Sequence, residues 1–140
     1  MRFVLDNSVA MRWLLRDGSD ERVSYAQKVL DLLADDANQA VAPHIWPLEV
    51  ANVIAKAEAK GLLTEARAAA FIGLLNDMAI AIDTKTAAQA LGDTLQLARR
   101  FKLSSYDAAY LELALREGLP LATLDADLQS ACLQTGGTLV

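Results

Sequence analysis

Short apolar segments alternate with longer segments of helical periodicity along the chain. Residues 2–5, 40–42, 79–82, 119–124 and 138–140 are short runs of strand length that are rich in apolar residues. Between them, apolar residues recur every three or four positions, which is typical of helices that bury one face. Strands that alternate with helices in this way predict an α/β fold with a parallel sheet covered on both faces.

The expected helices are bounded by capping residues as well as by periodicity. Ser8 is the predicted cap of the first helix, and Pro47 and Gly61 bracket the third. We find no linker, repeat or low-complexity tract, so residues 1–140 are interpreted as a single domain. The helices are expected over residues 8–17, 19–33, 47–60, 64–75, 84–100, 104–117 and from 125 onward.

Composition excludes several classes of protein. No apolar run approaches the ~18 residues of a membrane-spanning helix, and Asp6 interrupts the N-terminal apolar run, unlike in a secretory signal. We therefore expect a cytoplasmic protein. One cysteine, Cys132, excludes an internal disulfide and a thiolate zinc site, and one histidine, His44, excludes a histidine-pair mechanism. The net charge of −5 gives no bulk attraction to nucleic acid.

Four acidic residues are candidates for a common site. Asp6 and Asp125 each follow a predicted strand, and parallel strands end at the same edge of a sheet. Glu49 and Asp107 lie near the starts of helices, on faces that also carry apolar residues. We therefore expect a cluster of three or four carboxylates at this edge.

Clustered carboxylates repel one another, so such a site favours bound cations. Oxygen ligands without histidine or cysteine suit Mg²⁺ or Mn²⁺, and such sites commonly perform phosphoryl transfer or phosphodiester hydrolysis. The alternative is structural, because acidic residues in a first helical turn are common caps. Ser104 and Asp107, for example, form a Ser-x-x-Asp capping pattern.

The acidic residues lie within four motifs that resemble those of PIN-domain nucleases. The third and fourth motifs are the most specific, and all four keep the family's order over almost the whole chain. The small size makes the chain most similar to VapC-type toxins of type II toxin–antitoxin pairs. The motifs are Val4-Leu5-Asp6-Asn7-Ser8-Val9, Pro47-Leu48-Glu49-Val50-Ala51-Asn52, Leu103-Ser104-Ser105-Tyr106-Asp107-Ala108-Ala109-Tyr110 and Gly118-Leu119-Pro120-Leu121-Ala122-Thr123-Leu124-Asp125 with Asp127-Leu128.

This resemblance implies a five-stranded parallel sheet and an endoribonuclease that uses Mg²⁺ or Mn²⁺ to hydrolyse RNA phosphodiesters. It assigns the catalytic, metal-holding positions to Asp6, Glu49, Asp107 and Asp125. The accessory candidates are Asp127, Ser8 and Thr123.

The resemblance also implies a homodimer and a small VapB-like antitoxin that blocks the site, often with a basic side chain. The net charge of −5 fits a basic partner better than RNA, so RNA phosphates require local cations. Arg12 and Arg16 are four residues apart on the helix that follows Asp6, and we expect them to share a face beside the site. The alternative for both is a solvated charged face.

The sequence is also compatible with two other functions. Asp6 is a conceivable aspartyl nucleophile of a phosphatase, but such enzymes carry a second Asp two residues later, where this chain has Ser8. A catalytically silent PIN-like binding module is the second alternative, although such a module commonly lacks one of the four acids.

Overall fold

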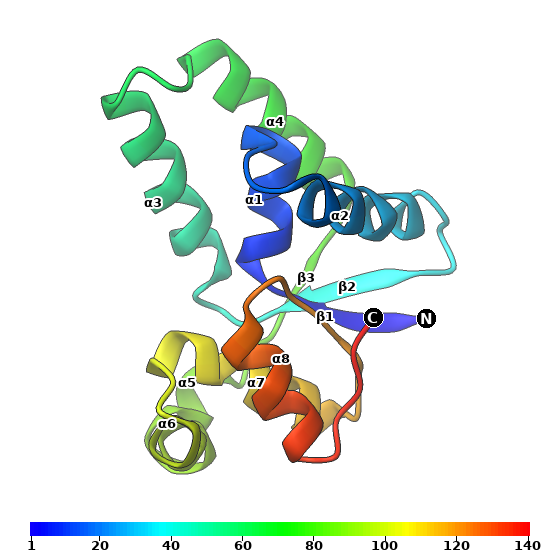
Figure 1. The fold of residues 1–140 in the computed structure, drawn as a ribbon, viewed down its shortest axis with the longest axis vertical. Helices are drawn as coiled ribbons and strands as arrows, with labels where there is room; N and C mark the ends of the chain where they lie inside the picture. Colours follow the sequence, from blue (N-terminus) through cyan, green and yellow to red (C-terminus); the bar gives the residue numbers. More distant parts are fainter.

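Four of the five predicted apolar segments pair as parallel strands at the centre of the computed structural model, which describes residues 1–140 (Figure 1). β1 lies in the middle of the sheet, and its residues Phe3, Val4 and Leu5 are fully buried. The strand order is β3-β2-β1-β4. The strands are β1 (Arg2–Leu5), β2 (Gln39–Ala42), β3 (Ala81–Ile82) and β4 (Leu121–Ala122).

The fifth segment joins this sheet only as an isolated parallel bridge between Leu121 and Leu139. Two hydrogen bonds hold it: the Leu121 N–H donates to the Thr138 carbonyl at 2.9 Å, and the Val140 N–H donates to the Leu121 carbonyl at 3.0 Å. The sheet therefore has four strands rather than five, in an otherwise confirmed α/β fold.

Helices cover both faces of the sheet, as the alternating pattern predicted. In Figure 1, α1 to α4 lie on one face and α5 to α8 on the other. No helix is both long enough and apolar enough to cross a membrane. The helices are α1 (Asn7–Leu15), α2 (Asp20–Leu33), α3 (Trp46–Ala59), α4 (Glu65–Asp77), α5 (Thr86–Gln89), the π-helical turn η1 (Ala90–Thr94), α6 (Leu95–Phe101), α7 (Ser105–Glu117) and α8 (Ala126–Gln134).

Two predicted helix boundaries were wrong. The helix expected over residues 84–100 is interrupted at Gly92, whose φ of −109° and ψ of −110° are not helical. Glycine has no Cβ and tolerates such a conformation, which periodicity does not reveal. Ser8 lies inside α1, and Asp6 occupies the N-cap position without making a side-chain cap.

The strand order places β4 on the opposite side of β1 from β2 and β3. From β1 the sheet grows through β2 to β3 on one side, while β4 lies on the other side of β1. This point, where the direction of growth reverses, is where open α/β sheets bind ligands beyond the carboxyl ends of their strands. The residues that follow β1 and β4 therefore mark the position of a site.

Candidate active site at the carboxyl ends of the strands

Asp6 is the most deeply buried acid of the site, with 4% of its surface exposed. Two hydroxyl groups donate to its Oδ2 atom: Ser8 Oγ at 2.6 Å and Thr123 Oγ1 at 2.7 Å. Burial raises the pKa of Asp6, the two hydroxyls partly offset this, and the charge of Asp125 raises it further. The end of β1 is thus linked to the end of β4, because the buried carboxylate of Asp6 accepts a hydrogen bond from Thr123.

Glu49 enters the site from the first turn of α3, where it is half-buried. The Tyr110 hydroxyl, on α7, donates to Glu49 Oε1 at 2.5 Å. Burial raises the pKa of Glu49, the hydrogen bond opposes this rise, and the charges of Asp6 and Asp107 add to it. Glu49 is therefore close enough to two other acids to be affected by their charge.

Asp107 lies in the first turn of α7, which packs against β1. Burial raises the pKa of Asp107, and the negative charges of Asp6 and Asp125 raise it further. The exposed Asp127, on α8, adds a smaller contribution of the same sign. Asp107 therefore connects α7 electrostatically with the acids that follow β1 and β4.

Asp125 caps α8, since its Oδ1 atom accepts a hydrogen bond from the Leu128 N–H at 2.9 Å. Its own N–H donates to Thr123 Oγ1 at 3.1 Å. Helix capping thus accounts for the position of one carboxylate oxygen of Asp125. It does not account for Asp6 or Glu49, whose side chains cap no helix.

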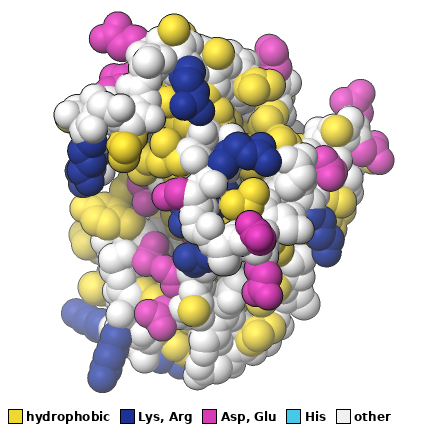
Figure 2. Space-filling model, turned by 45° about the horizontal axis from the view of Figure 1, so that its top comes forward, with side chains coloured by type: hydrophobic (Ala, Val, Ile, Leu, Met, Phe, Trp, Pro, Cys, Tyr) yellow, Lys and Arg dark blue, Asp and Glu magenta, His cyan; other side chains and the backbone are white.

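Each of the four acids thus lies within range of the charge of at least two others: Asp6 and Asp107 affect both Glu49 and each other, and Asp125 affects Asp6 and Asp107. As the side chains stand, no group of three or more His, Cys, Asp or Glu residues is arranged to hold a metal ion. Figure 2 views a face on which acidic side chains are interspersed with Lys, Arg and hydrophobic side chains. The arrangement is a set of mutually repelling carboxylates, which a cation would stabilise.

The two predicted phosphate-binding arginines do not share a helical face. Arg12 lies in α1 and forms an ion pair with Asp17 at 2.8 Å. Arg16 follows the end of α1 in the left-handed conformation, with a φ of 52°. Helical spacing therefore no longer relates the two side chains, because the chain leaves the helix between them.

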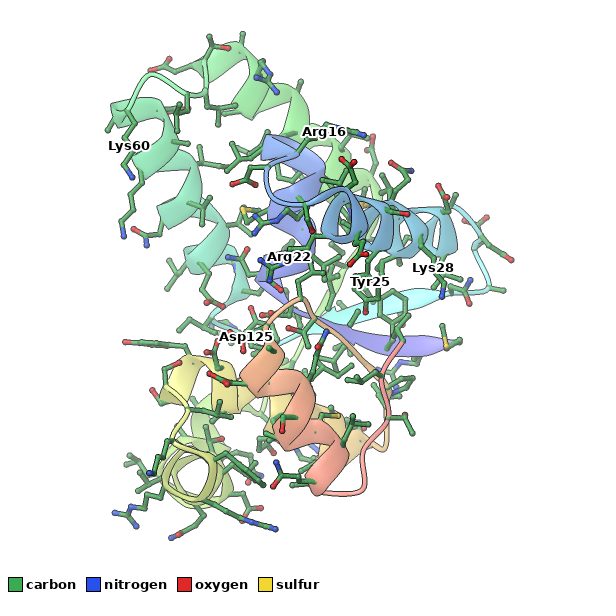
Figure 3. All side chains as sticks on the ribbon, in the orientation of Figure 1. Arg16, Arg22, Tyr25, Lys28, Lys60 and Asp125 are labelled. Carbon is green, nitrogen blue, oxygen red and sulfur yellow. The ribbon has the colours of Figure 1, made fainter.

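Arg22, on α2, is a cation near the site that the sequence did not indicate. Its Nη2 atom donates to the carbonyl of Leu124 at 2.7 Å, directly before Asp125 (Figure 3). This contact joins residues 102 positions apart, so no local pattern reveals it. Tyr110 was missed for the same reason, although it belongs to the third motif and follows Asp107 by one helical turn.

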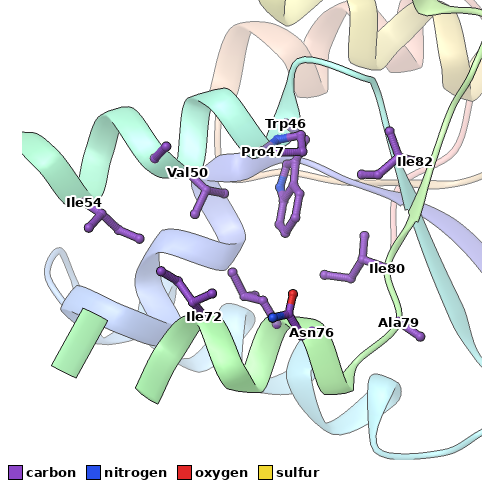
Figure 4. Close-up of a pocket in the computed structure, with 11 residues that line it drawn as sticks. Trp46, Pro47, Val50, Ile54, Ile72, Asn76, Ala79, Ile80 and Ile82 are labelled. Carbon is purple, nitrogen blue, oxygen red and sulfur yellow. The ribbon is translucent and has the colours of Figure 1, made fainter. Parts of the chain in front are cut away.

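An apolar cavity of about 390 Å³ opens between α3, α4 and β3, separate from the carboxylates. Trp46, Val50 and Ile54 line it from α3, and Ile72 and Ile80 face them (Figure 4). The indole N–H of Trp46 is buried there without a hydrogen-bond partner. Exposed hydrophobic side chains on or beside these helices are Leu48, Leu62, Ile72 and Leu74.

Comparison with known proteins defines the class of the chain. A family model described as the PIN domain matches residues 3–132, and the chain therefore belongs to the PIN-domain family. Ribonuclease VapC3 of Pyrobaculum aerophilum is 33% identical over 134 residues, covering 91% of this chain and 92% of that protein. The resemblance to VapC-type proteins that the four motifs indicated is thus confirmed.

A solved structure shows the same fold at lower sequence identity. The crystal structure of PAE2754 from Pyrobaculum aerophilum matches this chain with a TM-score of 0.65 at 19% identity. The match covers 94% of this chain and 84% of that one. The likeness therefore extends over the whole sheet and both helical layers.

Proposed function

We propose that the chain is a cytoplasmic, metal-dependent endoribonuclease that acts as the toxin of a toxin–antitoxin pair. The observation that supports this proposal is the mutual electrostatic influence of Asp6, Glu49, Asp107 and Asp125, with burial and repulsion between carboxylates raising the pKa of the first three. Membership of the PIN-domain family and the likeness to Ribonuclease VapC3 support the same activity.

The donor set fits Mg²⁺ or Mn²⁺. Glu49 and Asp125 each have one carboxylate oxygen engaged in a hydrogen bond, and the structure shows no hydrogen bond to the other oxygen. Single carboxylate oxygens are the protein ligands that Mg²⁺ accepts while it retains several waters. Since no three acids are yet arranged around an ion, we expect the carboxylates to draw together when one binds. When bound, the ion supplies an activated water and neutralises charge that develops on the phosphate.

The other residues of the site orient these acids and contact the substrate. Ser8 and Thr123 fix Asp6 by donating to the same oxygen. Asp127, at the exposed edge of the site, is an accessory acid. Arg22 is a proposed phosphate contact, because it reaches the residue before Asp125 and only one of its donors is engaged, by the Leu124 carbonyl.

Arg12 and Arg16 are retained as outer phosphate contacts. Arg16 is exposed, whereas Arg12 has to exchange its ion pair with Asp17 for a phosphate. Exposed ion pairs are weak, at roughly 0–1 kcal/mol, so this exchange costs little. Three arginines near the loop between α1 and α2 would thus provide local positive charge for RNA phosphates on a chain whose net charge is −5.

The proposed partner is a small VapB-like antitoxin with a basic segment. The carboxylates attract a basic side chain, and the apolar cavity between α3 and α4 offers hydrophobic contacts to a neighbouring helix. A homodimer is proposed as the assembled state of the toxin. Co-expression with the product of a short adjacent reading frame tests the partner, because a stable complex that suppresses cleavage is the expected result.

Cleavage of RNA by the purified chain tests the activity. Structured and unstructured RNA are incubated with Mg²⁺ or Mn²⁺, with a chelator, and with the Asp107→Asn variant. We expect cleavage that requires the metal and is lost in the variant. A phosphoaspartate trapped at Asp6 would instead identify a phosphatase, and the absence of both cleavage and metal binding would identify a silent binding module.

A further inference from the structure

Tyr110 is a fully buried tyrosine whose hydroxyl reaches the candidate site. It lies on α7, three residues after Asp107, and its hydroxyl donates to Glu49 Oε1 on α3. The ring contributes to the hydrophobic core, as any buried aromatic residue would. The hydroxyl does something more specific, because it engages one oxygen of a site carboxylate and leaves the other unengaged.

A related pattern occurs at Asp125, which accepts the Leu128 N–H on Oδ1. Asp6 differs, because it accepts the Asn7 N–H in addition to the two hydroxyl donors on Oδ2. Glu49 and Asp125, held by unrelated groups, thus each present a single oxygen without a hydrogen bond. The donor to Glu49 is the only one of these groups that is a tyrosine, and it comes from the helix that also carries Asp107.

A carboxylate that offers one oxygen suits some cations better than others. Mg²⁺ and Mn²⁺ favour octahedral sites with one oxygen from each carboxylate, whereas Ca²⁺ takes six to eight oxygens and often binds both oxygens of a carboxylate. A hydrogen bond to Oε1 competes with two-oxygen coordination by Glu49. It therefore penalises Ca²⁺ more than it penalises the smaller ions.

We infer that Tyr110 is a positioning residue that restricts Glu49 to one-oxygen coordination and so makes the site prefer Mg²⁺ and Mn²⁺ to Ca²⁺. The inference rests on the proposed function, since it assumes that the four carboxylates bind a cation. It assigns to Tyr110 a role in the choice of metal in addition to its packing in the core.

The Tyr110→Phe variant tests this inference, because it removes the hydroxyl and retains the ring. Mn²⁺ binding is followed by the electron paramagnetic resonance signal of free Mn²⁺, and Ca²⁺ is then added as a competitor. We expect the ratio of the Ca²⁺ to the Mn²⁺ dissociation constant to fall about 5-fold, the effect of one hydrogen bond. An unchanged ratio would overturn the inference.

Tyr106→Phe is the matched control, since Tyr106 is exposed on the same helix and no hydrogen bond of its hydroxyl is present. Its ion preference should equal that of the wild type. In a Glu49→Gln background, Tyr110→Phe should not change the ratio further, because its effect passes through Glu49. A further change there would overturn the inference.

A second variant keeps the test open if Tyr110→Phe does not fold. Glu49→Asp keeps the charge but shortens the side chain by one methylene, which withdraws the carboxylate from Tyr110, and it should reduce the ion preference in the same direction. A Tyr110→Phe protein that is less stable in chelator but has an unchanged ratio would assign the hydroxyl to stability alone. Wild-type protein that binds neither ion would instead refute the proposed function itself.

Discussion

The replacement of Thr123 by valine is expected to weaken the site and the fold together. Thr123 is 1% exposed, and its hydroxyl donates to Asp6 Oδ2 at 2.7 Å while accepting the Asp125 N–H at 3.1 Å. Valine has nearly the same shape, so the variant removes two hydrogen bonds without opening a cavity. It also leaves the buried Asp6 carboxylate with one hydroxyl donor instead of two.

The magnitude follows from the kind of bond that is lost. A hydrogen bond to a charged group contributes about 1.5–3 kcal/mol and a neutral one about 1 kcal/mol to the free energy of unfolding. The Asp6 bond belongs to the first kind and the Asp125 bond to the second. Thr123→Val should therefore cost about 3 kcal/mol, which corresponds to a fall in Tm of roughly 10 °C in a chain of this size.

Urea denaturation in chelator at pH 7 measures this loss. Thr135→Val is the matched control, since the Thr135 hydroxyl donates only to backbone carbonyls of its own helix, at 2.9 and 2.8 Å. We expect the control to lose less than ~1 kcal/mol. If Thr123→Val were as stable as the control, the Thr123 hydroxyl would not stabilise the buried Asp6 carboxylate, and the reasoning would be refuted.

Three further predictions concern charge. Asp6→Asn should raise the free energy of unfolding in chelator at pH 7, because the raised pKa of Asp6 means that its ionised form disfavours folding. If urea denaturation showed a lower stability for this variant, the role of Asp6 would be structural. Burial would raise the pKa of Asp83, but hydrogen bonds from Arg116 and Thr86 hold it below 3.8, so its ionised form favours folding. Asp83→Asn should thus cost ~2 kcal/mol at pH 7, and thermal melts should show this cost vanishing as the pH falls below about 4. Arg22→Ala should weaken RNA binding and reduce its salt dependence by about one phosphate contact; an unchanged slope would exclude that contact.

Local patterns predicted most of the fold. The β1 strand was predicted with its observed bounds, Arg2–Leu5. Its apolar run is short and ends at the polar residue Asp6, which fixes where the strand can stop. The helix starts at Ser19, Thr64 and Ser104 were also predicted from sequence, and each of these side chains accepts a hydrogen bond from an N–H three residues away. The break at Gly92 was missed because the apolar spacing continues across it.

The candidate site was predictable in part. The four acids could be proposed from sequence because each follows a strand or lies near the start of a helix, and both positions can be read from local sequence. Arg22 and Tyr110 were not found, because their partners, Leu124 and Glu49, lie 102 and 61 residues away. Arg16 was misplaced because its left-handed backbone ends the helix that the spacing assumed.

A calorimetric titration of Mn²⁺ into the wild-type chain and the Asp107→Asn variant tests the proposed cation site most directly. We expect the wild type to bind Mn²⁺ and the variant, folded to the same extent by circular dichroism, to bind it far more weakly or not at all. Equal Mn²⁺ binding by both proteins would contradict the assignment of Asp107 and, with it, the cation site at the carboxyl ends of the strands.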